Sequence, residues 1–95
     1  MRRASKVDDN QTEVVRALRD AGATVALTHT VGMGFPDAVV GFRDVNYLIE
    51  IKDGTKPLRD QELTPFQKEF HSAWRGTVHV VNSAEAALKA IGAVK

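Results

Sequence analysis

Apolar side chains recur along the chain with two different periods. Apolar residues three and four positions apart predict amphipathic helices, and short runs of β-branched and aromatic residues predict strands. The patterns predict helices at residues 10–21, 64–75 and 83–91, and strands at residues 24–28, 38–42, 47–51 and 77–82. Because a helix separates the last two strands, we expect those strands to be parallel. The predicted fold class is α/β, in the order α-β-β-β-α-β-α, with a mixed sheet flanked by helices.

Residues with capping chemistry mark the ends of two of these helices. Asn10 with Glu13 matches a capping box, and so does Thr64 with Gln67, which also has a proline at the first helical position. Gly22 fits a C-terminal cap. In this interpretation Glu13 and Gln67 complete capping boxes and need no further function.

Aromatic residues recur in the second predicted helix. Phe66, Phe70 and Trp74 are four positions apart, so they share one face of the helix. Large aromatic side chains gain most by burial. We therefore expect these three residues to face the core.

The two strands on either side of residues 43–46 predict a β-hairpin, because Asp and Asn favour turns. We expect Asp44 and Val45 to form the loop, so that Phe42 faces Tyr47. Side chains alternate between the faces of a strand. One face of the hairpin is then apolar, and the other carries the polar residues.

The polar residues of the hairpin are Asp37, Glu50 and Lys52, and the assumed register places Asp37 opposite Lys52 at the open end. Two neighbouring carboxylates suit a hard cation such as Mg²⁺ or Mn²⁺. A lysine beside them suits the developing charge of phosphodiester hydrolysis. The alternative is that Asp37 is a turn residue and that Glu50 and Lys52 form an ion pair on a solvated face.

The residues of this hairpin resemble those of a known family. Pro36-Asp37, followed by Glu50-Ile51-Lys52 at the end of the next strand, resembles the motif of the PD-(D/E)xK nuclease superfamily. Glu13 in the preceding helix and Gln67 in the following one are similar to the stand-alone VRR-NUC (viral replication and repair nuclease) branch, which is Holliday-junction-resolvase-like. The resemblance extends over residues 10–81.

The resemblance implies a restriction-endonuclease-like core and a Mg²⁺- or Mn²⁺-dependent deoxyribonuclease. It implies that the catalytic residues are Asp37, Glu50, Lys52 and Gln67. It implies that the metal ligands are Glu13, Asp37, Glu50 and the main-chain carbonyl of Ile51. It further implies branched or junction DNA as substrate, a homodimer, a role in replication, recombination or repair with a possible protein partner, and a phage or prophage source.

Composition limits these expectations. The chain has 95 residues, 43% apolar residues, no cysteine and a net charge of +1. These values fit one domain at residues 10–95 after a basic tail at residues 1–9, with no disulfide framework. No stretch reaches the length of a membrane span and no signal peptide is visible, so we expect a cytoplasmic protein.

Since the chain is not broadly basic, DNA contact would depend on local side chains after the polar hairpin. The candidates for nucleic-acid binding are Lys56, Arg59, Lys68 and His71. Two alternatives to an autonomous nuclease stay open: a non-catalytic nucleic-acid-binding domain of the same fold, and a nuclease subunit that depends on a partner.

Overall fold

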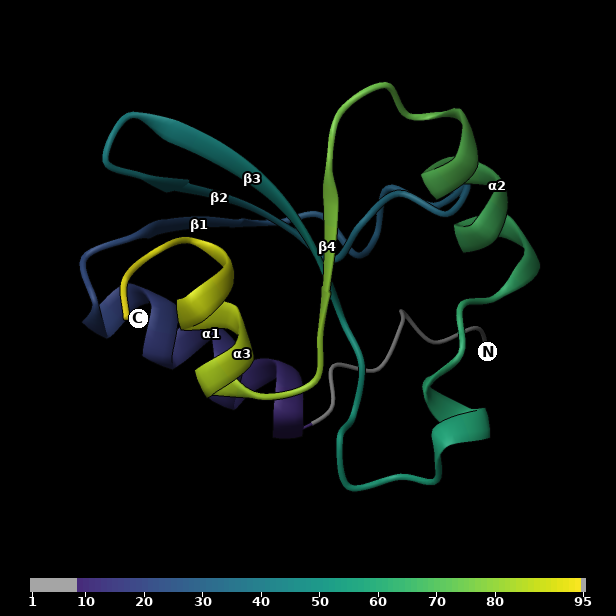
Figure 1. Cartoon of the computed structure of the whole chain (residues 1–95), viewed down its shortest axis with the longest axis horizontal. Helices are drawn as coiled ribbons and strands as arrows, with labels where there is room; N and C mark the ends of the chain where they lie inside the picture. Colours follow the sequence, from purple (N-terminus) through teal and green to yellow (C-terminus); the bar gives the residue numbers. More distant parts are fainter. Residues whose placement is uncertain (1–8, 95) are drawn as a thin grey trace.

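The computed structural model describes residues 9–94, and the predicted basic tail lies almost wholly outside them. Its helices and strands follow the predicted order, with one added 3₁₀ helix (Figure 1). The elements are α1 (Asp9–Asp20), β1 (Thr24–Leu27), β2 (Ala38–Phe42), β3 (Val45–Ile51), η1 (Leu58–Gln61), α2 (Pro65–Ala73), β4 (Val78–Val81) and α3 (Ala84–Ala90). No helix within the described range is long and apolar enough to cross a bilayer.

The four strands form one mixed sheet in the order β1-β2-β3-β4. β1 pairs antiparallel with β2, and β2 pairs antiparallel with β3. β3 and β4 are parallel, as the intervening helix predicted. The expected mixed α/β sheet flanked by helices is therefore confirmed.

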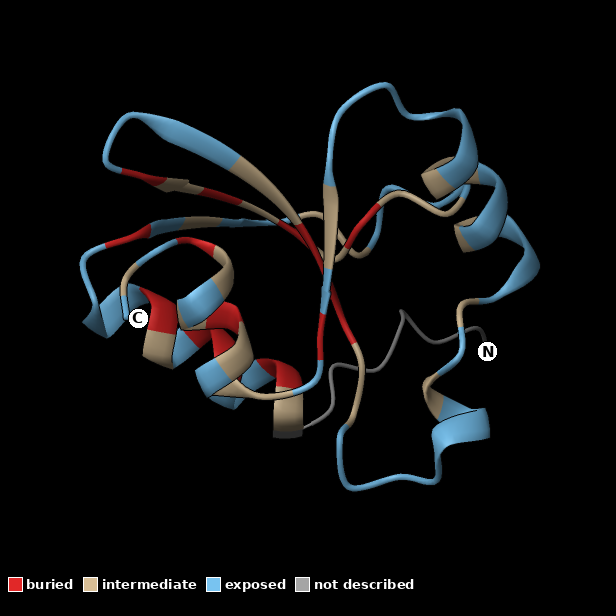
Figure 2. Cartoon of the chain, viewed as in Figure 1, coloured by how far each residue is buried: buried red, intermediate tan, exposed pale blue. Residues whose placement is uncertain are grey.

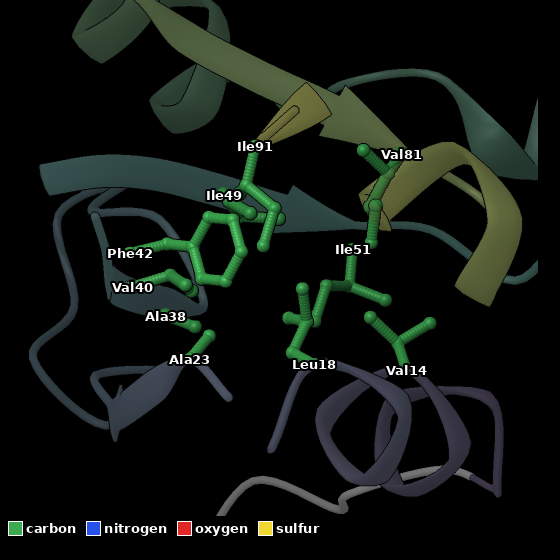
Figure 3. Close-up of a cluster of buried hydrophobic side chains, with 11 residues drawn as sticks. Val14, Leu18, Ala23, Ala38, Val40, Phe42, Ile49, Ile51, Val81 and Ile91 are labelled. Atoms are coloured by element: carbon green, nitrogen blue, oxygen red, sulfur yellow. The ribbon is translucent and has the colours of Figure 1, made fainter. Parts of the chain in front are cut away.

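The main core lies between the sheet and the pair of helices α1 and α3 (Figure 3). α1 contributes Val14 and Leu18, which are both fully buried, as their spacing predicted. Alternate residues of β2, including Val40, and the β3 residue Ile49 meet them from the sheet. Truncating a fully buried leucine to alanine typically costs about 2–5 kcal/mol, so Leu18 is a principal stabilising residue.

The hairpin turn is shorter than the sequence predicted. Phe42 pairs with Val45, so Arg43 and Asp44 form the two-residue loop. Both loop residues have positive φ, at 51° and 67°, which is the geometry of a type I′ turn. The predicted Asp44–Val45 loop and the pairing of Phe42 with Tyr47 are wrong. The error shifts the register by two residues, so each side chain still lies on its predicted face.

α2 lies apart from the main core and has no buried residue (Figure 2). Phe66 and Trp74 are 59% and 45% exposed, so the prediction that the aromatic face of this helix enters the core is wrong. Phe70 instead packs edge-on against Phe35 at 5.3 Å between ring centroids and stacks on Trp74 at 5.2 Å. A small aromatic cluster (Phe35, Phe70, Trp74) takes the place of core burial.

The capping predictions have mixed outcomes. The Thr64–Gln67 capping box is confirmed, with both reciprocal hydrogen bonds present. Gly22 has φ 100°, and the next residue donates to the carbonyl of Leu18, so the predicted C-terminal cap is confirmed as well. The predicted cap at Asn10 is wrong, because Asn10 lies inside α1 and its side chain bonds elsewhere.

Candidate active site

Two carboxyl groups meet where β2 begins and β3 ends. Because Ala38 pairs with Ile49, Asp37 lies opposite Glu50 on the adjoining strand. The Oδ2 atom of Asp37 accepts a hydrogen bond of 2.8 Å from the backbone N–H of Ile51. The predicted register has Asp37 opposite Lys52, and the two-residue shift moves Asp37 opposite Glu50. The carboxyl pair is therefore closer than the sequence predicted.

Glu50 is almost completely enclosed, with only 1% of its surface exposed. The pKa of Glu50 is raised to about 8, chiefly by burial and in addition by the neighbouring carboxyl of Asp37, while the positive charge of Lys52 acts in the opposite direction. Within the described residues, the buried Oε1 atom of Glu50 has no hydrogen-bond partner. Burying a carboxyl oxygen without a partner costs free energy, so this position suits a group that takes oxygen ligands.

Gln67 links α2 to this carboxyl pair. Its Nε2 donates to Oε2 of Glu50 at 3.0 Å, and its Oε1 accepts from Nζ of Lys52 at 2.7 Å. The same Oε1 accepts from the backbone N–H of Thr64 at 2.9 Å, which is half of the capping box. Gln67 thus completes the cap and contacts the acidic and basic residues at once, so the two interpretations of this residue are compatible.

Lys52 is held at its backbone as well as at its amine. Its N–H donates to the carbonyl of Val81 on β4 at 2.8 Å. Its carbonyl accepts from Nδ2 of Asn10 on α1 at 2.6 Å. Lys52, which follows the end of β3, is therefore fixed by a strand and a helix. Asn10 is a supporting residue, although the sequence pattern predicted that it caps a helix.

A close approach of two backbones sets the position of α2. Gly34 has φ 79°, and a Cβ atom placed on it would lie 2.1 Å from the carbonyl oxygen of Phe66. Only glycine lets the loop before β2 pass this near to the start of α2. Since Gln67 follows Phe66, the contact helps to bring the Gln67 amide to the carboxyl pair.

The remaining predicted metal ligands have different settings. Glu13 is exposed and lines a pocket of about 310 Å³ with Asn10, Asp53 and Thr55. Ile51 has its side chain in the core, and its N–H bonds to the carboxylate of Asp37. Within residues 9–94, no group of three or more His, Asp and Glu side chains is arranged to hold a metal ion.

The predicted nucleic-acid contacts lie after Lys52 on the loop, η1 and α2. Lys56, Arg59 and Lys68 are exposed. His71 is half-buried, and its buried Nε2 has no hydrogen-bond partner within the described part of the chain. Burial lowers the pKa of His71, and the nearby positive charge of Lys52 lowers it further, so its imidazole is neutral at pH 7.

The chain has no significant match among protein-family models, curated proteins or solved structures.

Proposed function

We propose that this protein is a metal-dependent DNA endonuclease with a restriction-endonuclease-like core of the PD-(D/E)xK type. One observation supports the proposal most directly: Asp37 and Glu50 are paired, and Lys52 is joined to the pair through Gln67. A solvated surface ion pair, which was the alternative interpretation, does not require Glu50 to be buried to 1% exposure. A buried acid with a raised pKa beside a specific charged partner is typical of functional sites.

The donor set fits a hard divalent cation such as Mg²⁺ or Mn²⁺. Asp37 and Glu50 supply carboxylate oxygens, and the unpartnered Oε1 of Glu50 is an oxygen in need of a ligand. When bound, the cation would supply positive charge to the phosphate and a water molecule of lowered pKa. Glu13 and the carbonyl of Ile51 complete the ligand set implied by the family resemblance.

The protein groups would divide the remaining work between them. The ammonium of Lys52 orients the attacking water and stabilises negative charge on the phosphate. Gln67 holds that ammonium through its Oε1 atom, 2.7 Å from Nζ. Water adds to phosphorus and the bond to the 3′ oxygen breaks, which leaves a 5′ phosphate and a 3′ hydroxyl. Lys56, Arg59 and Lys68, which are exposed on the loop, η1 and α2, would contact the phosphate backbone.

The experiment that tests this function is cleavage of labelled four-way junction, flap, duplex and single-stranded DNA in Mg²⁺, Mn²⁺ or EDTA. The variants are Asp37→Asn, which keeps an acceptor for Ile51, and Lys52→Met, with Lys89→Met on the exposed side of α3 as the matched control. We expect both site variants to lose at least 100-fold in rate and the control to retain it. The preferred DNA would identify the substrate.

Two results would argue for something else. Binding to DNA without cleavage in either metal would favour the alternatives of a binding domain or a partner-dependent subunit. Cleavage that is equally fast in both site variants would show that the active site lies elsewhere.

A further inference from the structure

The sheet has an open edge at β4. In Figure 1, β4 lies in front of β3 and β2, with α1 and α3 on one side and α2 on the other. Val81 accepts from the N–H of Lys52, so its backbone points toward β3. Since peptide groups alternate along a strand, those of His79 point inward and those of Val78 and Val80 point outward. Within the described residues, no hydrogen bond covers these outward groups.

The opposite edge, β1, is protected. Thr28 donates to the carbonyl of Asp37, so alternation turns the carbonyl of Val25 away from the sheet. The guanidinium of Arg19 donates to this outward carbonyl at 3.2 Å. A charged side chain on a free edge is a common defence against strand pairing. The two edges of the same sheet therefore differ in chemistry.

The β4 edge carries no such protection. Residues 77–82 contain no Lys, Arg, Asp, Glu or Pro. Val80 is 49% exposed on an edge strand made largely of β-branched residues. A segment of this kind pairs readily with another strand, including an identical copy of itself.

We propose that β4 pairs antiparallel with β4 of a second copy of this chain, about a two-fold axis that passes beside His79. In this register Val78 of each copy exchanges backbone hydrogen bonds with Val80 of the other. The side chains of these valines lie on one face of the joined sheet and cover each other. His79 faces His79 of the second copy as a non-hydrogen-bonded pair.

The outward-pointing backbone groups favour this register over the one that is centred on Val80. Centring the pair on Val80 would require the backbone of Asn82 to bond across the interface. The Asn82 carbonyl already lies beside Gly54, where an added Cβ atom would be 2.6 Å away, and the Asn82 side chain donates to Gln61. The loop after β3 therefore occupies that end of the edge, which disfavours the register centred on Val80.

The pairing has a consequence for the carboxyl pair. A two-fold axis perpendicular to a continuous sheet keeps the same face of both copies on one side. Asp37 and Glu50 lie on the face opposite the main core, so both copies would present their sites to one side of the dimer. Action of both sites on one DNA molecule rests on the proposed function, whereas the pairing itself does not.

Disulfide trapping tests the register, because the chain has no cysteine of its own. A non-hydrogen-bonded pair places two Cα atoms about 4.5 Å apart, within the range of a disulfide. The diagonal between the two copies of Val80 is about 7–8 Å, which is too long. We expect His79→Cys to form a covalent dimer on mild oxidation at least ten times faster than Val80→Cys or Val45→Cys.

Sedimentation tests the interface independently. Val80→Lys and Val45→Lys are matched, since the two valines are 49% and 48% exposed and both lie in strands. We expect the wild type and Val45→Lys to be dimers and Val80→Lys to be a monomer with unchanged circular dichroism. A monomeric wild type, or a dimer that survives Val80→Lys and is not trapped by His79→Cys, would overturn the pairing. Cleavage by a monomer would leave the proposed function intact.

Discussion

Replacing Glu50 with glutamine removes the ionisable group at this position and retains the shape of the side chain. The side-chain oxygen of the new amide can accept from Nε2 of Gln67, as Oε2 of Glu50 does at 3.0 Å. Its NH₂ group then replaces the unpartnered Oε1 and can donate to the carboxylate of Asp37. The variant therefore gains a partner where the wild type has two acidic groups in contact.

The size of the stability change follows from the pKa of Glu50, which burial and Asp37 raise from 4.5 to about 8. Between these values the native protein binds more protons than the unfolded chain, so stability falls as pH rises through the window. Each pKa unit corresponds to about 1.4 kcal/mol, and ionising this group at pH 9 costs on the order of 2–5 kcal/mol. We expect Glu50→Gln to be more stable than wild type at pH 9 by that amount and nearly equal at pH 5.

The assay is thermal and denaturant unfolding of both proteins at pH 5, 7 and 9 in EDTA. For a domain of this size the stability difference at pH 9 corresponds to a rise in Tm of about 8–40 °C. The difference between the two proteins isolates Glu50, because other titrating groups such as His71 are common to both. Parallel stability curves from pH 5 to pH 9 would refute the reasoning, since they would mean that Glu50 ionises normally.

Three further predictions concern the metal, the amide link and the close glycine. Mn²⁺ should raise the Tm of wild type more at pH 8 than at pH 6, because it competes with protons, and should not shift that of Glu50→Gln; an equal shift in both would place the cation elsewhere. Gln67→Ala should cost about 2–4 kcal/mol in denaturant unfolding and Thr64→Ala only about 1, because the former also strips a partner from a buried carboxyl; equal costs would reduce Gln67 to a helix cap. Gly34→Ala should alter the fluorescence of the single tryptophan by displacing α2, whereas Gly32→Ala, with φ 86° but no atom within 4 Å, should cost only about 1–2 kcal/mol of backbone strain; identical effects would show that the close contact is unimportant.

Local signals in the sequence were sufficient for most of the fold. The Thr64–Gln67 capping box and the cap at Gly22 depend on neighbouring residues only, and both are present. The hairpin register depends on two residues that rarely take positive φ together. Arg43 and Asp44 lack the Asn-Gly or Asp-Gly signature of a type I′ turn. The Arg43 guanidinium lies 4.7 Å from the centroid of the Phe42 ring, a contact that no sequence pattern announces.

The site was predictable in part, because side chains alternate between the two faces of a strand. The faces of Asp37 and Glu50 follow from alternation and survive the two-residue shift, so the sequence located the acidic pair. The burial of Glu50 was not predictable, because it depends on tertiary contacts such as the hydrogen bond from Gln67 on α2, an element distant in the sequence. The amphipathic pattern of α2 suggested core packing, yet that helix packs by its own aromatic cluster. Asn10 was assigned to a cap because its long-range contact with Lys52 leaves no local trace.

The separation of α2 from the main core gives the site a stability of its own. Sheet, α1 and α3 share one apolar cluster, whereas α2 is attached through Gln67, the close contact at Gly34 and a few aromatic rings. Such elements detach at a lower free energy than the whole molecule unfolds. Release of α2 would expose Glu50 to water, lower its affinity for protons and free the amine of Lys52. We therefore expect α2 to detach before the sheet unfolds, so that the assembled site is lost in a molecule whose sheet is still folded.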